Sequence, residues 1–241
     1  MKDMLIEMHH INKKYREVAV LNDLNIKIER GSIAGIIGPN SVGKTTLLNI
    51  MSGLVTPDTG DVFFEGNTIS DNKHLIGYVP QEIALYQDLS VKENFRFFSG
   101  IYGLSKKDAA DRTAYIYDIM VLKDVHKTRI KNLSGGMKRR INIGVELLKD
   151  PKVLIMDEST VGIDLSARIG ITDLVKKLNG EGITIVFTSH HMNELENICT
   201  DFYFLKDGRV VLAGDREEIL EEHGESRTLE QIYSDIYRIV E

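Results

Sequence analysis

The sequence predicts an α/β fold built on a mostly parallel β-sheet, with helices crossing between its strands. The apolar run 33–37 is followed directly by a glycine-rich loop and a segment of helical character. After residue 151, strand-like and helix-like segments alternate, which is typical of a parallel sheet with crossover helices. Between these regions the stretch 87–150 has only helical patterns, which indicates an inserted helical subdomain.

The strands near the N-terminus are expected to differ in burial. The run 33–37 is apolar throughout and is typical of a strand buried on both faces. The strands before it alternate apolar and polar residues, so one face of their sheet is expected to be exposed. A helix over 45–52 follows the glycine-rich loop and ends at Gly53. The predicted strands in this region are 5–11, 21–28, 33–37, 62–64 and 77–81.

Two capping signals begin the helices of the insertion. Ser90 with Glu93 fits a capping box, and Gly103 ends that helix. Ser105 with Asp108 begins the next one. After the insertion, the predicted strands are 153–156, 183–188 and 202–206, the predicted helices are 165–179 and 191–199, and a hairpin turn lies at Asp207-Gly208.

We expect a single domain over residues 1–241. Segments 1–86 and 151–224 would form its core and β subdomain, 87–150 the helical subdomain, and 225–241 a C-terminal amphipathic helix. Thr228 with Gln231 caps that last helix, and its apolar stripe either packs back on the domain or meets a partner. The stripe consists of Leu229, Ile232, Tyr233, Ile236, Tyr237 and Val240.

Composition narrows the classes of function. With 241 residues and 42% hydrophobic composition, the chain can bury one sizeable core. The net charge of −6 argues against broad binding to nucleic acid. The basic run 138–140 is interpreted as a solvated helix face, and Cys199, the single cysteine, as a small buried residue. No stretch approaches the ~20 apolar residues that span a bilayer, so a membrane role would come through a partner.

The loop 38–45 fits the pattern G-x-x-x-x-G-K-[ST] between a buried strand and a helix. Backbone N–H groups of such a loop converge on phosphate oxygens at the start of the helix. Lys44 can place its charge between the β and γ phosphates, and the Thr45 hydroxyl can ligate Mg²⁺. The loop therefore predicts a nucleotide-binding site.

Two carboxylates end the apolar strand 153–156. Neighbouring residues at a strand end point in different directions, so Asp157 and Glu158 can take different roles. Asp157 would hold Mg²⁺, and Glu158 would orient or deprotonate an attacking water. The pair would lie beside the phosphate loop if both strands belong to one parallel sheet.

A second glycine pair lies at the start of another predicted helix. The segment 133–137, Leu-Ser-Gly-Gly-Met, supplies an anion site that one nucleotide in one subunit does not need, which suggests a partner subunit. Three other positions are ambiguous on local grounds: Tyr15 could be a surface aromatic residue, Gln81 an ordinary loop residue, and His190 a helix cap.

Taken in order, these segments resemble the ATP-binding subunit of an ABC (ATP-binding cassette) transporter over nearly the whole chain. The phosphate loop resembles Walker A, the strand with Asp157 and Glu158 resembles Walker B, and the second glycine pair resembles the signature motif. The form Leu-Ser-Gly-Gly-Met and the closing segment 228–233 are similar to the subfamily that energises exporters of the ABC-2 type. The resemblance implies a RecA-like P-loop NTPase core, an antiparallel β subdomain near the N-terminus and a helical subdomain with the signature.

The resemblance also implies a role for each site residue. Glu158, His190, Gln81 and Lys44 would be catalytic, and Thr45, Gln81 and Asp157 would hold Mg²⁺. Asp164 would communicate between subunits in a D-loop. The signature residues Leu133, Ser134, Gly135, Gly136 and Met137 would bind the ATP of the partner subunit. The nucleotide would be bound by Tyr15, Gly38, Pro39, Asn40, Ser41, Val42, Gly43, Lys44, Thr45 and Thr46.

The implied assembly is a homodimer or heterodimer of such subunits around ATP and Mg²⁺. It would bind a separate integral-membrane permease at the inner face of the cell membrane, near the segment 84–89, and would not bind nucleic acid. A rival interpretation is a soluble ABC ATPase that regulates a protein or nucleic-acid complex, and a third is a nucleotide-binding scaffold without turnover.

Three positions depart from the family pattern. Residue 41 is Ser where Gly is frequent, residue 137 is Met where Gln is usual, and residue 159 is Ser where Pro is common. If residue 41 needs a left-handed backbone, Ser costs roughly 1–2 kcal/mol relative to Gly. The sequence does not identify the transported substrate.

Overall fold

The computed structural model describes residues 3–189, 192–223 and 227–237. Its contacts divide the chain into two compact units. The first unit comprises Met1–Lys73 and Thr184–Glu241, and the second comprises His74–Ile183. The predicted helical segment 87–150 lies within the second unit, and the exact domain boundaries stay a prediction.

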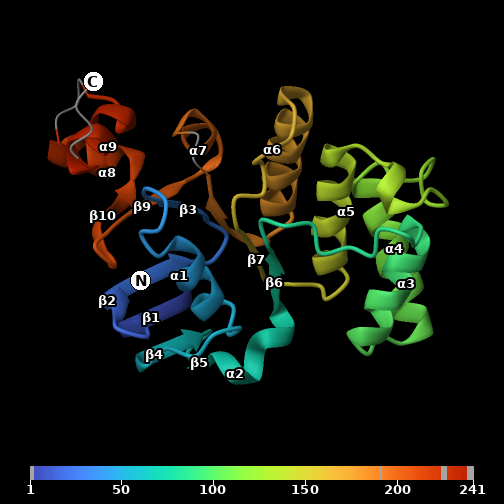
Figure 1. Cartoon of the computed structure of the whole chain (residues 1–241), viewed down its shortest axis with the longest axis horizontal. Helices are drawn as coiled ribbons and strands as arrows, with labels where there is room; N and C mark the ends of the chain where they lie inside the picture. The colour runs from blue at the N-terminus through green and yellow to red at the C-terminus, as the bar shows by residue number, and fades with distance from the viewer. Residues whose placement is uncertain (1–2, 190–191, 224–226, 238–241) are drawn as a thin grey trace. The chain divides into compact units, whose positions relative to one another are not determined.

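Most strands belong to the first unit (Figure 1). Its strands are β1 (Met4–Tyr15), β2 (Val18–Glu29), β3 (Ile33–Ile37), β4 (Thr59–Phe64), β5 (Asn67–Thr68), β8 (Thr184–Thr188), β9 (Asp201–Lys206) and β10 (Arg209–Asp215). Its helices are α1 (Lys44–Met51), α2 (Ile69–Asn72), α7 (Met192–Ile198), α8 (Arg216–His223) and α9 (Leu229–Tyr237). A 3₁₀ turn, Lys73–Leu75, lies where the chain passes into the second unit.

An antiparallel sheet forms first along the chain, in the order β2-β1-β4-β5. Strand β1 buries Leu5, Ile6, Met8 and Ile11 and leaves its other residues partly or fully exposed, with register shifts where β1 pairs with β2. The predicted half-exposed strands and the antiparallel β subdomain are therefore present.

The phosphate loop follows β3, which belongs to a second, mostly parallel group of strands. Strand β3 is buried at all five positions and pairs in parallel with β8 on one side and β9 on the other. The predicted hairpin joins β9 to β10, with positive φ at Asp207 (49°) and Gly208 (71°). No side chain fits at Gly208, because a Cβ there would lie 2.6 Å from the carbonyl oxygen of Val20. The turn is thereby fixed against β2.

The C-terminal helix packs back on its own unit. Helices α7 and α8 contact α9, and Leu229 and Ile232 of the stripe are fully buried. Thr228 Oγ1 accepts from the Gln231 amide at 3.2 Å, while Gln231 Oε1 accepts from the Thr228 amide at 3.0 Å. The predicted cap and the first of the two predicted packings are confirmed; Val240 lies outside the described residues.

The second unit combines two strands with most of the longer helices. Strands β6 (Ile76–Val79) and β7 (Val153–Met156) pair in parallel. The helices are α3 (Val91–Ile101), α4 (Lys106–Ile119), α5 (Gly135–Leu147) and α6 (Leu165–Gly180), with a 3₁₀ turn at Ile130–Asn132. The capping box of Ser90 with Glu93 is present, and Ser105 caps α4 by accepting from the Asp108 amide.

The predicted fold class is confirmed: the structure is α/β with a mostly parallel sheet, an antiparallel N-terminal sheet and a helix-rich segment. Helix α8 is an element that sequence reasoning missed. Asp215 and Glu218 form reciprocal side chain to amide hydrogen bonds at its start, at 2.9 and 3.1 Å. The Asp-x-x-Glu spacing of residues 215 and 218 is the sequence signal that could have predicted the start of this helix.

A pair of glycine substitutions tests the packing of the helices in the second unit. A Cβ at Gly144 of α5 would lie 2.9 Å from Ile116 Cγ2 and 3.1 Å from the Phe95 ring, whereas a Cβ at Gly100 of α3 meets nothing within 4 Å. We expect Gly144→Ala to lower the free energy of unfolding by about 1–3 kcal/mol through overpacking. Gly100→Ala, the matched control, should raise it by about 0.5–1 kcal/mol. Urea unfolding measures both; a stabilised Gly144→Ala protein would contradict the packing described.

Candidate functional site

The phosphate loop 38–43 joins the buried strand β3 to helix α1. Gly43 precedes the helix with φ 109°, a conformation that L residues rarely adopt. A Cβ on Gly43 would lie 3.0 Å from both the Val20 carbonyl oxygen and Leu21 Cδ2 of β2. The loop thus needs glycine for its backbone angle and for its close approach to β2.

Lys44 is held inside its own loop. Its side chain is 5% exposed, and its ammonium group donates to the carbonyl oxygens of Gly38 at 2.8 Å and Pro39 at 3.0 Å. Thr45, next along α1, is exposed. The loop therefore places a buried positive charge next to an accessible hydroxyl at the start of a helix, which suits a phosphate with its metal ion.

Ser41 has a left-handed backbone. Its φ is 63°, so the condition under which serine costs more than glycine is met. Pro39, Asn40 and Ser41 are exposed, while Gly38 and Gly43 are buried at the two ends of the loop. The strained residue therefore lies in the exposed middle part of the loop.

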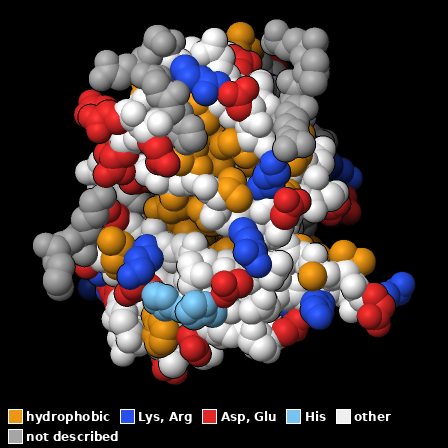
Figure 2. Space-filling view, turned by 90° about the vertical axis from the view of Figure 1, so that its left-hand side faces the viewer, with side chains coloured by type: hydrophobic (Ala, Val, Ile, Leu, Met, Phe, Trp, Pro, Cys, Tyr) orange, Lys and Arg blue, Asp and Glu red, His pale blue; other side chains and the backbone are white. Residues whose placement is uncertain are grey.

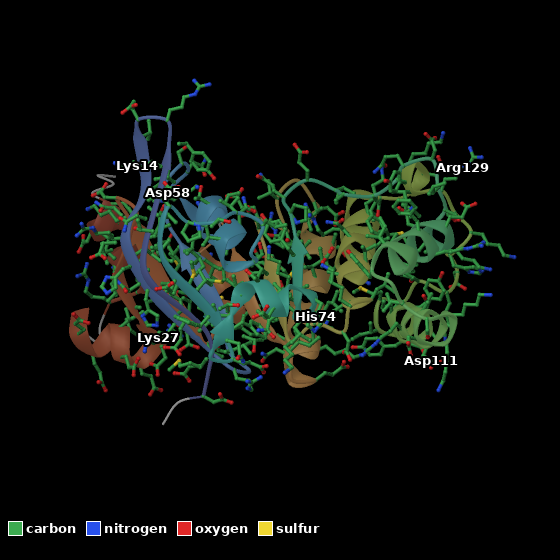
Figure 3. All side chains as sticks on the ribbon, turned by 90° about the horizontal axis from the view of Figure 1, so that it is seen from below. Lys14, Lys27, Asp58, His74, Asp111 and Arg129 are labelled. Carbon is green, nitrogen blue, oxygen red and sulfur yellow. The ribbon has the colours of Figure 1, made fainter. Side chains whose placement is uncertain are left out.

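Tyr15 lies at the end of β1, where a polar network fixes the backbone. The Asp58 carboxylate accepts from Lys13 Nζ at 2.8 Å and from the Lys14 amide at 2.7 Å, and Figure 3 shows Lys14 and Asp58 together. The hydrogen bond from Lys13 and the one from the Lys14 amide lower the pKa of Asp58. The Tyr15 ring is 47% exposed, and Lys13 Nζ lies 5.7 Å from its centroid. The ring is available for stacking.

Tyr237 of α9 contacts the start of the phosphate loop, which sequence reasoning missed. Its hydroxyl lies 2.9 Å from the Leu205 carbonyl oxygen and 3.3 Å from that of Ile37, and it donates toward both. Burial raises the pKa of Tyr237, so the hydroxyl stays a donor. The apolar stripe suggested only packing for this residue, because the hydroxyl contact depends on where β3 and β9 end.

The two carboxylates are on the second unit, at the end of β7. The Asp157 amide donates to the Val79 carbonyl oxygen at 2.9 Å, which extends the pairing of β7 with β6. Asp157 is 2% exposed and Glu158 9% exposed. Burial raises the pKa of Tyr78, and the charge of Asp157 and a hydrogen bond to it raise that pKa further. The Tyr78 hydroxyl therefore stays protonated and donates to the Asp157 carboxylate, a partner that the sequence did not reveal.

The two residues that follow Asp157 have an unusual backbone angle and an unusual burial. Glu158 has φ 43°, and its carbonyl oxygen accepts from the Val161 amide at 3.1 Å. Ser159, at the position where proline is common, is fully buried, and its Oγ has no hydrogen-bond partner within the described part of the chain. A buried hydroxyl without a partner costs about 1–3 kcal/mol. The serine at this position therefore costs free energy that a proline, which has no hydroxyl, would not.

The signature residues form the start of α5. Ser134 caps the helix, and its Oγ accepts from the Met137 amide at 3.3 Å. Ser134 and Gly135 are exposed, while Leu133 is buried and Met137 partly so. A Cβ on Gly136 would lie 2.4 Å from Ala167 Cβ of α6, whereas one on Gly135 would meet only Ile163, at 3.6 Å. Gly136 is thus needed for packing inside the subunit, and Gly135 is the accessible glycine.

The interpretation of 138–140 as a solvated face is wrong at Arg139. This residue is 3% exposed. Its Nη1 donates to the Pro80 carbonyl oxygen at 2.6 Å, and its Nη2 donates to the Gln81 carbonyl oxygen. The Gln81 side chain is exposed, next to a backbone that Arg139 holds. The physical reason for the burial is this long-range contact, which charge patterning along one helix does not reveal.

Asp164 has a structural role in the subunit. It caps α6, and its Oδ1 accepts from the Ala167 amide at 2.9 Å. His190 lies outside the described residues. Just before it, the buried Ser189 donates to Glu194 Oε2 at 2.5 Å, which fixes the end of β8 against α7.

The residues present fit a nucleotide with one hard metal ion. A glycine loop that tolerates no side chain at Gly43, a buried ammonium and an exposed Thr45 hydroxyl suit phosphates. Among residues 3–189, 192–223 and 227–237, no three His, Cys, Asp or Glu side chains gather as a metal cage.

On the face shown in Figure 2, acidic and basic side chains are interspersed. The described helices include none that is long and apolar enough to cross a membrane.

A substitution at Ser41 tests the strain in the loop. Ser41→Gly should raise the free energy of unfolding by about 0.5–1 kcal/mol. Glycine removes roughly 1–2 kcal/mol of backbone strain from the folded state, but its greater freedom in the unfolded chain offsets part of that gain. Ser41→Ala is the matched control, since it removes the hydroxyl but keeps the strained backbone. Urea unfolding without nucleotide measures both; equal stability of the two variants would argue against strain at this residue.

The family model of the ABC transporter matches residues 21–161. The linearmycin resistance ATP-binding protein LnrL of Bacillus subtilis is 38% identical over 219 residues, which cover 89% of this chain and 70% of LnrL. The Nod factor export ATP-binding protein I of Cupriavidus pinatubonensis is 35% identical over 221 residues, which cover 90% of this chain and 68% of that protein.

Solved structures agree with these relatives. The ATP-binding subunit of an ABC transporter superposes with a TM-score of 0.86 at 26% identity, covering 97% of this chain and 99% of the other. A dimeric ATP-binding cassette in a post-hydrolysis state with ADP and Pi superposes with a TM-score of 0.78 at 25% identity, covering 88% and 98%. The predicted family is confirmed: the chain belongs to the ABC transporter family and is an ATP-binding, ATP-hydrolysing subunit.

Proposed function

We propose that two such subunits enclose ATP and Mg²⁺, and that closure and hydrolysis drive export through a separate membrane permease. The observation that carries this proposal is the exposed Ser134-Gly135 start of α5 in a chain that already has a complete phosphate loop. In its cap, the Ser134 hydroxyl accepts through a lone pair, so its hydrogen can still be donated to a γ-phosphate. The resistance and export functions named for the relatives support an exporter.

The proposal gives each site residue a defined role. Lys44 places its charge on the β and γ phosphates, and the helix start at Thr45 orients them. Glu158 accepts a proton from the attacking water, while Gln81 and His190 donate hydrogen bonds that position the water and the γ-phosphate. Bound Mg²⁺, held by Thr45, Asp157 and Gln81, would supply positive charge to the phosphate oxygens. Tyr15 stacks on the adenine.

A row of exposed apolar residues supports dimer formation around Asp164. Val161, Leu165 and Ile169 are 37%, 68% and 54% exposed and are spaced four residues apart. Leu165 and Ile169 share one face of α6, and Val161 lies in the turn just before the helix. We assign this row, which begins beside the Asp164 cap, to the contact with the partner cassette, whether identical or related.

An exposed aromatic cluster supports the contact with the permease. Tyr86 lies after Gln81, and its ring contacts that of Phe97 with centroids 4.6 Å apart in an edge arrangement. Tyr86, Phe97 and Ile101 are 50%, 39% and 60% exposed. Exposed aromatic residues are typical of interface anchors. This surface would place the subunit on the inner face of the cell membrane.

The rival regulatory ATPase is less well supported. The net charge of the chain is −6, and on the face shown in Figure 2 basic side chains are mixed with acidic ones instead of gathering as nucleic acid requires. ATPase measurement with and without membranes that contain the permease separates the proposals. Stimulation supports a transport subunit, whereas co-purification of nucleic acid without a membrane protein supports the rival.

The role of Glu158 is tested by Glu158→Gln. The variant should bind ATP and accumulate as a dimer. Its turnover should fall by at least about 100-fold, because the amide cannot accept the proton. Steady-state ATPase and size-exclusion chromatography measure these two properties. Glu217→Gln on the exposed face of α8 is the control and should keep wild-type turnover. Wild-type turnover of Glu158→Gln would remove Glu158 from the role of base.

Tyr78→Phe tests the support of the metal-binding carboxylate. Loss of the hydroxyl that donates to Asp157 should raise the Mg²⁺ concentration for half-maximal ATPase activity by about tenfold. The control is Tyr203→Phe, which removes a hydroxyl hydrogen bond, at 2.6 Å to the Lys27 carbonyl oxygen, in the other unit. The Mg²⁺ dependence of ATPase activity is the measurement; equal Mg²⁺ requirements in both variants would refute the role of Tyr78.

A further inference from the structure

One face of α5 holds the backbone at the end of β6 and just after it. Glu146 Oε2 accepts from the Tyr78 amide at 3.1 Å, and Asn142 Oδ1 accepts from the Ala84 amide at 3.2 Å. Between these contacts, Arg139 donates to the carbonyl oxygens of Pro80 and Gln81. Residues 139, 142 and 146 lie on one face of the helix because they are three and four positions apart. The segment 78–84 is thus bound to α5 through its backbone.

Arg139 is a charged residue at a buried position, where its desolvation is unfavourable. Within the described part of the chain it forms no ion pair, and its Nε has no hydrogen-bond partner. Burial lowers the pKa of Arg139. A buried charge without a carboxylate costs free energy, and an apolar side chain would fill the same space at lower cost. The benefit of the guanidinium is its fork of N–H groups, which reaches two consecutive carbonyl oxygens at once.

The same helix begins at the signature. Ser134 caps α5 five residues before Arg139, and Gly136 packs against Ala167 in the first turn of α6. Arg139 therefore lies in the second turn of the helix that presents the signature to a partner subunit. A change in the direction of α5 would be passed to the Gln81 backbone through two hydrogen bonds.

We propose that Arg139 is a positioning residue that fixes the backbone of Pro80 and Gln81 to the signature helix, so that the exposed Gln81 side chain moves with α5. The inference rests on the proposed function for its consequence in catalysis. Arg139 touches neither nucleotide nor water in this account and acts through Gln81. Loss of its hydrogen bonds should affect turnover more than ATP binding, because the phosphate loop belongs to the other unit and is held by its own contacts with β2.

The test compares Arg139→Gln, Arg139→Lys and the control Lys138→Gln in the full-length chain. Lys138 is the neighbouring cation, is half-exposed and has one long hydrogen bond, at 3.4 Å to the Lys131 carbonyl oxygen. Two properties are measured: kcat and KM for ATP, and amide hydrogen exchange over residues 80–85. Exchange over β1 and over α4 in the same samples reports on the stability of each unit.

Arg139→Gln should exchange faster over 80–85 while exchange over β1 and α4 stays unchanged. Its kcat should fall about tenfold or more, as expected when a catalytic group is misplaced, with KM changed less than twofold. Arg139→Lys should recover part of kcat, because an ammonium can reach one carbonyl oxygen. Lys138→Gln should match the wild type in both properties.

Two results would overturn the proposal. Wild-type kcat and exchange in Arg139→Gln would show that the contact positions nothing. Faster exchange throughout the second unit, with kcat lost in proportion to unfolded protein, would show that Arg139 serves stability alone. Failure of the proposed function is recognised separately: the wild-type chain itself would then hydrolyse no ATP, and exchange over 80–85 would still decide whether Arg139 fixes this segment.

Discussion

The structure depends on the left-handed turn at Gly43, where the phosphate loop passes within contact distance of β2. That approach excludes a side chain at Gly43 and directs Lys44 back toward the carbonyl oxygens of Gly38 and Pro39. The ammonium group is buried by contacts within its own loop, so the fold itself meets the desolvation cost. Strand β3, buried on both sides between β8 and β9, gives the loop a rigid origin.

The functional residues are supported by different kinds of contact in the two units. In the first unit, backbone packing and the Tyr237 hydroxyl hold the phosphate loop. In the second, side chains hold backbone or other side chains: Tyr78 supports Asp157, and Arg139 supports the Gln81 segment. Because each set of contacts is internal to its unit, the functional residues of each unit are held in place by that unit alone.

Local patterns predicted those parts of the fold that depend on neighbours in sequence. The phosphate loop, the capping boxes at Ser90 and Thr228 and the hairpin at Asp207-Gly208 are determined within a few residues, so their spacing was sufficient. The sequence predicts a cost for Ser41 only if its backbone is left-handed, and the backbone is left-handed. The functional residue roles came from resemblance to a family and stay predictions.

The contacts that sequence reasoning missed join distant segments. Arg139 and its carbonyl partners are nearly 60 residues apart, and a basic run gives no sign of which cation is buried. Gly136, which the resemblance assigns to binding the ATP of the partner subunit, is also required for packing against α6.

The central claim is that one ATP site is completed by two subunits. Mixing two inactive variants, Lys44→Ala and Ser134→Arg, tests it most directly. A mixed dimer has one site with both residues intact, formed by the phosphate loop of the Ser134→Arg chain and the signature of the Lys44→Ala chain. The account predicts that each variant alone is inactive and that the mixture recovers ATP hydrolysis. Full turnover by the Ser134→Arg chain alone, or a mixture of folded, dimerising variants that stays inactive, would contradict it.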